Sequence, residues 1–227
     1  MTALVALGPA PGSQIWTKAL QVKALVPEIS VLIRVGGEPT RDADARCFAD
    51  EIACSPSTLA FEDTPDLDDV AAFFHTGGTT GAPKLVIHTQ RNQLAAAYGG
   101  AYAAGVCGDD IIVNGLPMFH VASTIFCSLG IFAARGQLVV LSAAGFRDPS
   151  IVANFLHIVA RTGATIVGGV PTALSAVVKT DASSADLSRV RVNISGAASL
   201  PRTVAEELER ITGKPVREGT ACPRPAA

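Results

Sequence analysis

The chain has little net charge and no apolar run long enough to cross a membrane. Its 18 Lys and Arg residues nearly balance 20 Asp and Glu residues, for a formal net charge of −2. This balance gives no electrostatic reason to expect a nucleic acid or an anionic membrane as a partner. The most apolar stretch, 121–134, contains Ser123 and Thr124 and stops before Arg135, so it is too short for a transmembrane segment.

Signals for metal binding, disulfide bonding and secretion are also missing. The five cysteines are odd in number and show no C-x-x-C spacing, which favours buried thiols over a metal site or a disulfide framework. The N-terminus has no basic segment and no cleavage signal, and Leu4–Leu7 has the composition of a strand. We therefore expect a cytoplasmic protein without a protein-bound metal.

Strand-like and helix-like segments alternate along almost the whole chain, and no internal repeat interrupts them. The 227 residues suffice for one large or two small domains, and 48% hydrophobic residues with a mean hydropathy of +0.36 suit buried parallel strands covered by helices. The alternation predicts an α/β, doubly wound fold with mostly parallel sheets and flanking helices. Strands are expected at residues 4–7, 31–35, 71–74, 85–87, 111–113, 137–141, 164–167 and 190–194, and helices at 16–26, 42–54, 89–104, 121–134, 149–162 and after Pro171 and Pro201.

The most informative stretch runs from His75 to Lys84 and reads His-Thr-Gly-Gly-Thr-Thr-Gly-Ala-Pro-Lys. Glycine lets backbone N–H groups approach a ligand, threonine hydroxyls add donors, and Lys84 adds a positive charge, which together suit a polyphosphate. Pro83 separates Gly81 from Lys84 and a β-prone run follows, so neither a Walker loop nor a dinucleotide fingerprint fits. We expect a strand–loop–strand connection, and the alternative is an ordinary hairpin loop.

Three more segments directly follow predicted strands, which is where parallel sheets place their ligands. They are residues 117–120, 168–172 and 195–198. These three segments could line one crevice, with the phosphate loop covering it. Simpler interpretations remain open: His120 as the cap of a helix, and Pro171 as the first residue of one.

The stretch 76–84 closely resembles the phosphate-binding signature of the AMP-forming acyl-CoA synthetases. Their adenylate-forming superfamily also contains luciferases and peptide-synthetase adenylation domains. Residues 116–120, 170–172 and 195–201 are similar to the family segments Leu-Pro-Leu/Met-Phe-His, Val-Pro-Thr and Ser-Gly-Ala-x-x-Leu-Pro. The residues that match the signature are Thr76, Gly77, Gly78, Thr79, Thr80, Gly81, Pro83 and Lys84.

The resemblance implies a ligase that joins a small-molecule carboxylate to ATP with Mg²⁺, releases pyrophosphate, and passes the acyl group to the co-substrate coenzyme A, as in fatty acid metabolism. Thr76–Gly81 and Lys84 would bind the ATP phosphates, and His120 would act as the catalytic residue beside the acyl pocket. The adenine and acyl pocket would comprise Val170, Pro171, Thr172, Gly196, Ala197, Ala198, Glu218 and Gly219.

The family pattern breaks off after Glu218-Gly219. Relatives continue there with Tyr-Gly-Met/Leu-Thr-Glu, an aspartate for the ATP ribose, and a mobile C-terminal domain that carries a further lysine. We therefore expect residues 1–219 to form a partial AMP-binding domain and residues 220–227 to be a divergent tail, from a shifted reading frame or disordered. Such an internal fragment should have little activity unless a partner chain supplies the missing segments.

Two other functions stay open. One is a non-catalytic nucleotide- or acyl-binding module, a pseudoenzyme that docks on a partner. The other is a peptide-synthetase adenylation domain, which would carry an acyl-pocket aspartate that is absent near Val170–Thr172.

Overall fold

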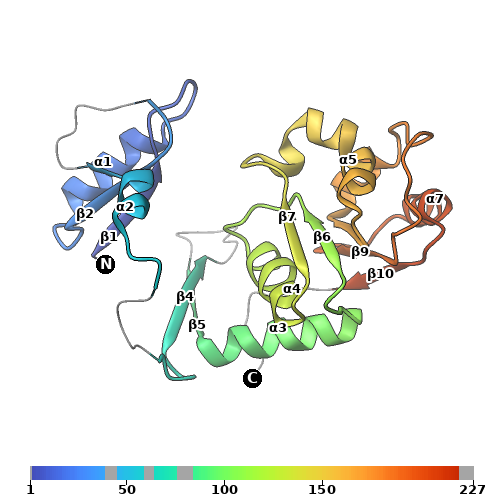
Figure 1. The fold of residues 1–227 in the computed structure, drawn as a ribbon, viewed down its shortest axis with the longest axis horizontal. Coiled ribbons are helices and arrows are strands. Elements are labelled where there is room, and N and C mark those ends of the chain that lie inside the picture. Colours follow the sequence, from blue (N-terminus) through green and yellow to red (C-terminus); the bar gives the residue numbers. More distant parts are fainter. Residues whose placement is uncertain (1, 39–44, 59–63, 76–83, 220–227) are drawn as a thin grey trace. The chain divides into compact units, whose positions relative to one another are not determined.

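The computed structural model divides the chain into two compact units, Met1–Thr64 and Pro65–Ala227. Figure 1 shows the helices and strands of both units. The residues that the structure describes are 2–38, 45–58, 64–75 and 84–219.

The first unit is a parallel three-stranded sheet in the order β1-β2-β3. Strand β1 (Ala3–Leu7), helix α1 (Ile15–Leu25) and strand β2 (Val31–Val35) form a β–α–β unit, as the sequence predicts. Trp16 and Ala19 of α1 pack against Leu32 of β2. This small core holds α1 against the sheet.

The predicted helix over residues 42–54 is wrong in its first part. Ala45–Cys47 forms strand β3, and helix α2 (Phe48–Cys54) begins only at Phe48. Ala45 pairs with Leu32 on the edge of β2 and packs in the core of the unit, whereas Phe48 and Ile52 are 42% and 58% exposed. Pairing with a free strand edge satisfies backbone groups, and a helical periodicity in the sequence does not reveal it.

In the second unit, an antiparallel strand pair flanks the predicted phosphate loop. Strand β4 (Val70–His75) pairs with β5 (Leu85–Thr89), with His75 opposite Leu85. Helix α3 (Gln90–Ala104) follows at once. The Thr89 hydroxyl accepts the Asn92 amide N–H at 3.2 Å, and the Asn92 side chain accepts the Thr89 amide N–H at 3.2 Å. This capping box confirms the predicted helix start.

The main sheet has five parallel strands in the order β10-β9-β8-β6-β7. The chain places β7 on one side of β6 and then returns to add β8, β9 and β10 on the other side, so the order reverses between β6 and β8. Ligands of such sheets bind beyond the carboxyl ends of the strands at this reversal. The strands are β6 (Ile111–Asn114), β7 (Gln137–Val140), β8 (Ile166–Gly169), β9 (Val192–Gly196) and β10 (Val216–Gly219).

Helices cover both faces of this sheet (Figure 1). Val113 and Val167 belong to the larger core, which includes residues of α5 (Pro149–Thr162), α6 (Pro171–Val177) and α7 (Arg202–Thr212). Their neighbours Ile112 and Ile166 belong to a second core on the opposite face, as the alternation of side chains along a strand requires. The prediction of an α/β fold with mostly parallel sheets and flanking helices is therefore confirmed.

Four details differ from the sequence predictions. Strands β8 and β9 each begin two residues later than expected and extend to Gly169 and Gly196, and the short strand β10 was not anticipated. The apolar segment 121–134 is mostly a π-helix, η1 (Ala122–Leu129), continued by α4 (Gly130–Ala133). A 3-10 turn, η2 (Gly145–Arg147), precedes α5.

Among the described residues, every helix is too short or too polar to cross a membrane.

Candidate functional site

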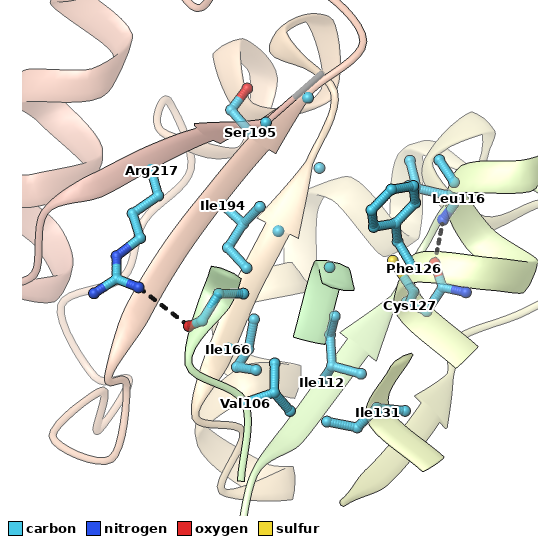
Figure 2. Close-up of a pocket in the computed structure, with 18 of the residues that line it drawn as sticks. Val106, Ile112, Leu116, Phe126, Cys127, Ile131, Ile166, Ile194, Ser195 and Arg217 are labelled. Atoms are coloured by element: carbon cyan, nitrogen blue, oxygen red, sulfur yellow. Dashed lines mark hydrogen bonds between the residues drawn. The ribbon is translucent and has the colours of Figure 1, made fainter. Parts of the chain in front are cut away.

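A cavity of about 360 Å³ lies where the strand order reverses, over the face of the sheet that carries Ile112 and Ile166 (Figure 2). Its volume is in the range of small-molecule sites, roughly 300–1,000 Å³. Helix α3 contributes small residues, Gly100, Ala101, Ala103 and Ala104, and the bulkier apolar lining consists of Val106, Ile112, Phe126, Cys127, Ile131, Ile166 and Ile194. Such a lining suits an apolar group.

The register of the strands explains the shape of the cavity floor. Arg217 of β10 lies opposite Ile194 of β9, which lies opposite Gly168 of β8, so these three residues form one row. Nearer the carboxyl ends, Gly219 lies opposite Gly196, and a Cβ added at Gly196 would come within 2.9 Å of the Gly219 carbonyl oxygen. A side chain therefore does not fit at Gly196 without a shift, whereas a Cβ at Gly219 would meet nothing within 4 Å. As the sequence stands, neither residue of this second row carries a side chain, so a planar group can lie directly against backbone.

Five of the residues predicted for the pocket line this cavity: Val170, Gly196, Ala197, Glu218 and Gly219. Ala197 is a non-glycine residue with a φ of 75°, a left-handed conformation that costs energy and is common at functional sites. The Glu218 carboxylate accepts the Leu200 amide N–H at 3.0 Å and so ties the loop after β9 to β10.

The other predicted pocket residues lie beside the cavity but not in its lining. Pro171 and Thr172 form the first turn of α6, and Ala198 is exposed in the loop after β9. Their contact with a ligand stays a prediction.

His120 lies at the start of the helical segment and is exposed. Its Nδ1 accepts the Ala122 amide N–H at 3.2 Å, and its carbonyl oxygen accepts amide N–H groups of Ser123 and Thr124. The simpler interpretation, a capping histidine, therefore describes its contacts. With Nδ1 accepting, the neutral ring carries its proton on Nε2. The catalytic role of His120 stays a prediction.

Asn114, which the sequence analysis did not select, supports the segment that carries His120. It ends β6, is 3% exposed, and lines the cavity. Its side-chain oxygen accepts the Leu116 amide N–H at 3.0 Å, and its Nδ2 donates to Ser123 Oγ at 2.6 Å. Ser123 Oγ in turn lies 3.1 Å from the Met118 sulfur. These contacts fix both ends of the 116–120 loop.

The π-helix positions Phe126 as a wall of the cavity. A Cβ added at Gly100 would come within 2.6 Å of the Phe126 ring, so the ring packs against α3 where α3 has no side chain. Ser128 Oγ donates to the Ser123 carbonyl oxygen five residues earlier at 2.8 Å, a spacing that matches the wider turn. π-Helical segments are often found at functional sites.

An ion pair between a buried carboxylate and a partly exposed arginine joins the opposite, amino-terminal ends of the strands. Asp110, just before β6, accepts from Arg191 at 2.6 Å and from the Thr165 hydroxyl at 2.6 Å, and its carboxylate also accepts the Cys107 amide N–H at 2.8 Å. Burial opposes the charged carboxylate, but these hydrogen bonds outweigh it and lower the pKa of Asp110 below its usual range. The network links β6 to the segments that precede β8 and β9.

The predicted phosphate loop itself, Thr76, Gly77, Gly78, Thr79, Thr80 and Gly81, lies outside the described residues. The residues on either side of it are described. His75 ends β4, Lys84 directly precedes β5, and both are exposed. The second nearby histidine, His88, is buried on β5 and packs against the Phe74 ring at a centroid distance of 4.9 Å.

No cluster suited to a metal is present in the described part of the chain. No group of three or more His, Cys, Asp or Glu side chains there could hold an ion.

Burial raises the pKa of the Cys127 thiol to about 11, so this cavity residue is a neutral thiol at neutral pH.

Comparison with known proteins gives one consistent family. Marinolic acid–CoA ligase of Pseudoalteromonas sp. (strain SANK 73390) is 28% identical over 233 aligned positions, which cover 97% of this chain and 35% of the relative. 4-Coumarate–CoA ligase 1 of Oryza sativa subsp. japonica is 33% identical over 163 positions, covering 68% of this chain and 27% of the relative. The chain thus spans about a third of the length of these curated relatives.

Solved structures show the same fold. The anthranilate CoA ligase AuaEII in complex with anthranoyl-AMP matches with a TM-score of 0.77 at 23% identity, over 89% of this chain and 38% of that one. MbtA of Mycobacterium smegmatis matches with a TM-score of 0.76 at 22% identity, over 97% of this chain and 38% of that one. The sequence profile described as "AMP-binding enzyme" matches residues 8–220. Together with the parallel sheet and its cavity, this match shows that the chain belongs to the AMP-binding enzyme family of adenylate-forming ligases.

Proposed function

We propose that this chain forms the ATP- and acyl-binding part of an AMP-forming acid–thiol ligase. In the complete reaction, a carboxylate oxygen attacks the α-phosphorus of Mg·ATP and pyrophosphate leaves. The thiol of coenzyme A then attacks the acyl carbon and AMP leaves. The family match and the relatives that are named as CoA ligases support this proposal.

The carboxylic acid would place its apolar tail in the cavity between α3 and the sheet. The cavity is lined by apolar side chains such as Ile112, Ile166 and Phe126, and burying a tail against them is favourable by about 25 cal/mol per Å² of apolar surface. The reacting carboxylate would lie at the carboxyl ends of the strands, near Leu116 and the 116–120 loop that carries His120.

The nucleotide would bind at the same edge of the sheet. Gly196 and Gly219 leave bare backbone there, against which the planar adenine could pack next to Ala197 and Glu218. Thr76–Gly81 and Lys84 would hold the phosphates, since charge-assisted hydrogen bonds to phosphate are about twice as strong as neutral ones. Mg²⁺ would enter with ATP, and no residue of this chain is assigned to it.

Full turnover in this proposal also needs the ribose aspartate and the distal lysine that the family pattern places beyond Gly219. They would come from further segments or from a partner chain. Removing one such group from a related site typically lowers kcat about 100- to 1,000-fold. We therefore propose that the 227 residues bind ligands better than they turn them over.

The observation that carries the proposal is the convergence of Val170, Gly196, Ala197, Glu218 and Gly219 on one cavity at the reversal of strand order. These residues come from segments that the sequence places up to 49 positions apart, Val170 to Gly219.

The test is to measure both ATP protection against thermal unfolding and carboxylate-dependent pyrophosphate release. We expect Mg·ATP to raise the Tm of the wild-type chain, and Lys84→Ala to reduce that rise. Lys179→Ala, an exposed lysine after α6, is the matched control and should behave as wild type. A Tm that Mg·ATP leaves unchanged would overturn the proposal.

Pyrophosphate release separates the ligase from the alternatives. Release with fatty or aryl acids that depends on Lys84 supports the acid–thiol ligase. Protection by ATP without release from a chain extended by the family's C-terminal segments supports a non-catalytic binding module. Release only with amino acids supports a peptide-synthetase adenylation domain.

A further inference from the structure

We propose that Arg217 determines which acyl tails the cavity accepts, because its side chain closes the flank of the cavity at the edge of the sheet. This inference rests on the proposed acyl-binding role of the cavity. It concerns the selection of the tail, and not the activation of the carboxylate.

The position of Arg217 follows from its strand. Strand β10 is an edge of the five-stranded sheet, and Arg217 lies opposite Ile194 in the parallel register. Residues opposite each other in a parallel pair point to the same face, so Arg217 emerges on the face that Ile194 shares with the cavity. Both residues line the cavity.

The side chain then extends across the open side of the cavity to helix α3. Its Nη1 donates to the carbonyl oxygen of Ala104 at 3.1 Å, and the dashed line from the Arg217 guanidinium in Figure 2 marks this contact. Ala104 is the last residue of α3. Carbonyl groups in the last turn of a helix lack partners within the helix, and a cation is favoured there by the helix dipole.

Among the described residues, the lining that comes from α3 is small. It consists of Gly100, Ala101, Ala103 and Ala104, and Val106 follows just after the helix. A Cβ at Gly105 would come within 3.9 Å of Arg217 Nη1, so the guanidinium occupies the gap between the helix end and the strand. The aliphatic stem of Arg217 can cover apolar surface while its charged end stays in water.

The consequence is a limit on the length and width of the tail. A tail that enters from the carboxyl ends of the strands runs along Ile194 and Ile166 and meets the Arg217 stem at the edge of the sheet. Without that stem, a longer tail could continue past β10. Differences of one methylene in an apolar pocket change selectivity by roughly 10- to 200-fold, so a wall of this size is enough to set a preference.

The test compares the acyl chain-length preference of the 227-residue chain before and after substitution. Binding of hexanoate, decanoate and hexadecanoate is measured by displacement of the fluorescent fatty acid cis-parinaric acid, without ATP. We expect Arg217→Ala to shift the affinity ratio of hexadecanoate to hexanoate by about tenfold toward the longer acid. Arg217→Met, which keeps an apolar stem without its donors, should shift the ratio less. Arg202→Ala, an exposed arginine paired with Glu206 on α7, should leave it unchanged.

Three outcomes are informative. An unchanged ratio in Arg217→Ala overturns the inference alone. Failure of the wild-type chain to bind any of the acids overturns both the inference and the acyl-binding half of the proposed function, while the ATP measurement reports on the nucleotide half separately. If Arg217→Ala does not fold by circular dichroism, Arg217→Val, which also shortens the stem but suits a strand, decides the question, and a ratio equal to wild type then counts against the inference.

Discussion

The side-chain amide of Asn114 donates to the hydroxyl of Ser123 at 2.6 Å and thereby connects the end of β6 to the first turn of the π-helix. Both residues are buried, at 3% and 0% exposure. The intervening loop carries His120 and borders the cavity, so this contact ties the strand before the loop to the helix after it.

Asn114→Ala should lower the free energy of unfolding by about 2 kcal/mol, because the Leu116 amide and the Ser123 hydroxyl lose a partner in a buried setting. Urea denaturation of Asn114→Ala, Ser123→Ala and the double variant measures the coupling. We expect a coupling free energy of about 0.5–3 kcal/mol. Strict additivity would show that the two side chains do not act together.

Asp110→Asn should destabilise the chain by about 2 kcal/mol at neutral pH, because Arg191 would lose its charged partner. The pKa of Asp110 is lowered in the folded state. The ion pair therefore stabilises the fold at pH values above the ordinary carboxyl pKa, about 3.9. That contribution disappears as the pH falls through the lower folded pKa. Urea denaturation between neutral pH and about pH 3 should therefore show wild type and Asp110→Asn converging in acid. The exposed neighbour Asp109 supplies the control, Asp109→Asn, which should follow wild type at every pH.

Two adjacent glycines of α3 offer a matched pair of substitutions. Gly99→Ala meets nothing within 4 Å and should stabilise the helix by about 0.5–1 kcal/mol. Gly100→Ala would bring a Cβ within 2.6 Å of the Phe126 ring, so the ring must move and the gain should be cancelled or reversed. Urea denaturation reports the stability, and cis-parinaric acid binding reports the cavity wall. Equal effects of the two substitutions would contradict the assigned contact.

Cys127 should react with iodoacetamide much more slowly than the exposed Cys54 and Cys107. Burial raises its pKa from 9.0 to about 11, which lowers the thiolate fraction at neutral pH on the order of 100-fold. Peptide mapping by mass spectrometry after timed labelling measures the three rates. Denaturation in urea should bring them together, and equal rates in the folded chain would refute the buried position of Cys127.

Much of the fold could be predicted where local chemistry specifies an element. Thr89 and Asn92 identify the start of α3, and Asp148 before Pro149 identifies the start of α5, where the Asp148 carboxylate accepts the Ser150 amide N–H at 2.9 Å. These contacts lie within three residues in sequence. The strands of apolar residues, such as β6, are likewise visible in composition.

The elements that the sequence did not reveal depend on distant partners. Strand β10, Val-Arg-Glu-Gly, has one apolar residue and exists because it pairs with β9. Strand β3 has the same origin, in its pairing with β2. The π-helical winding of residues 122–129 also left no signal in the apolar pattern, which suits an α-helix equally well.

The candidate site likewise has parts that can be predicted from local sequence and parts that depend on distant contacts. Motifs identify the segments around Val170, Gly196 and Glu218, and the first two also directly follow predicted strands. The cavity walls were not selected, because an alanine-rich helix and a π-helix carry no ligand-binding pattern. Arg217 was missed for a related reason: its contact with Ala104 joins residues 113 positions apart, and only the assembled sheet brings them together.

The ion pair of Asp110 and Arg191 also affects what the far ends of the same strands can be. Because the amino-terminal ends are anchored by charge and hydrogen bonds, the carboxyl-terminal ends do not need large side chains to stay aligned. Glycine and alanine can therefore occupy them, as at Gly168, Gly169 and Gly196. In these strands the amino-terminal ends hold the sheet together and the carboxyl-terminal ends line the cavity. Substitutions at the cavity end can therefore change its shape without weakening the contacts that align the strands.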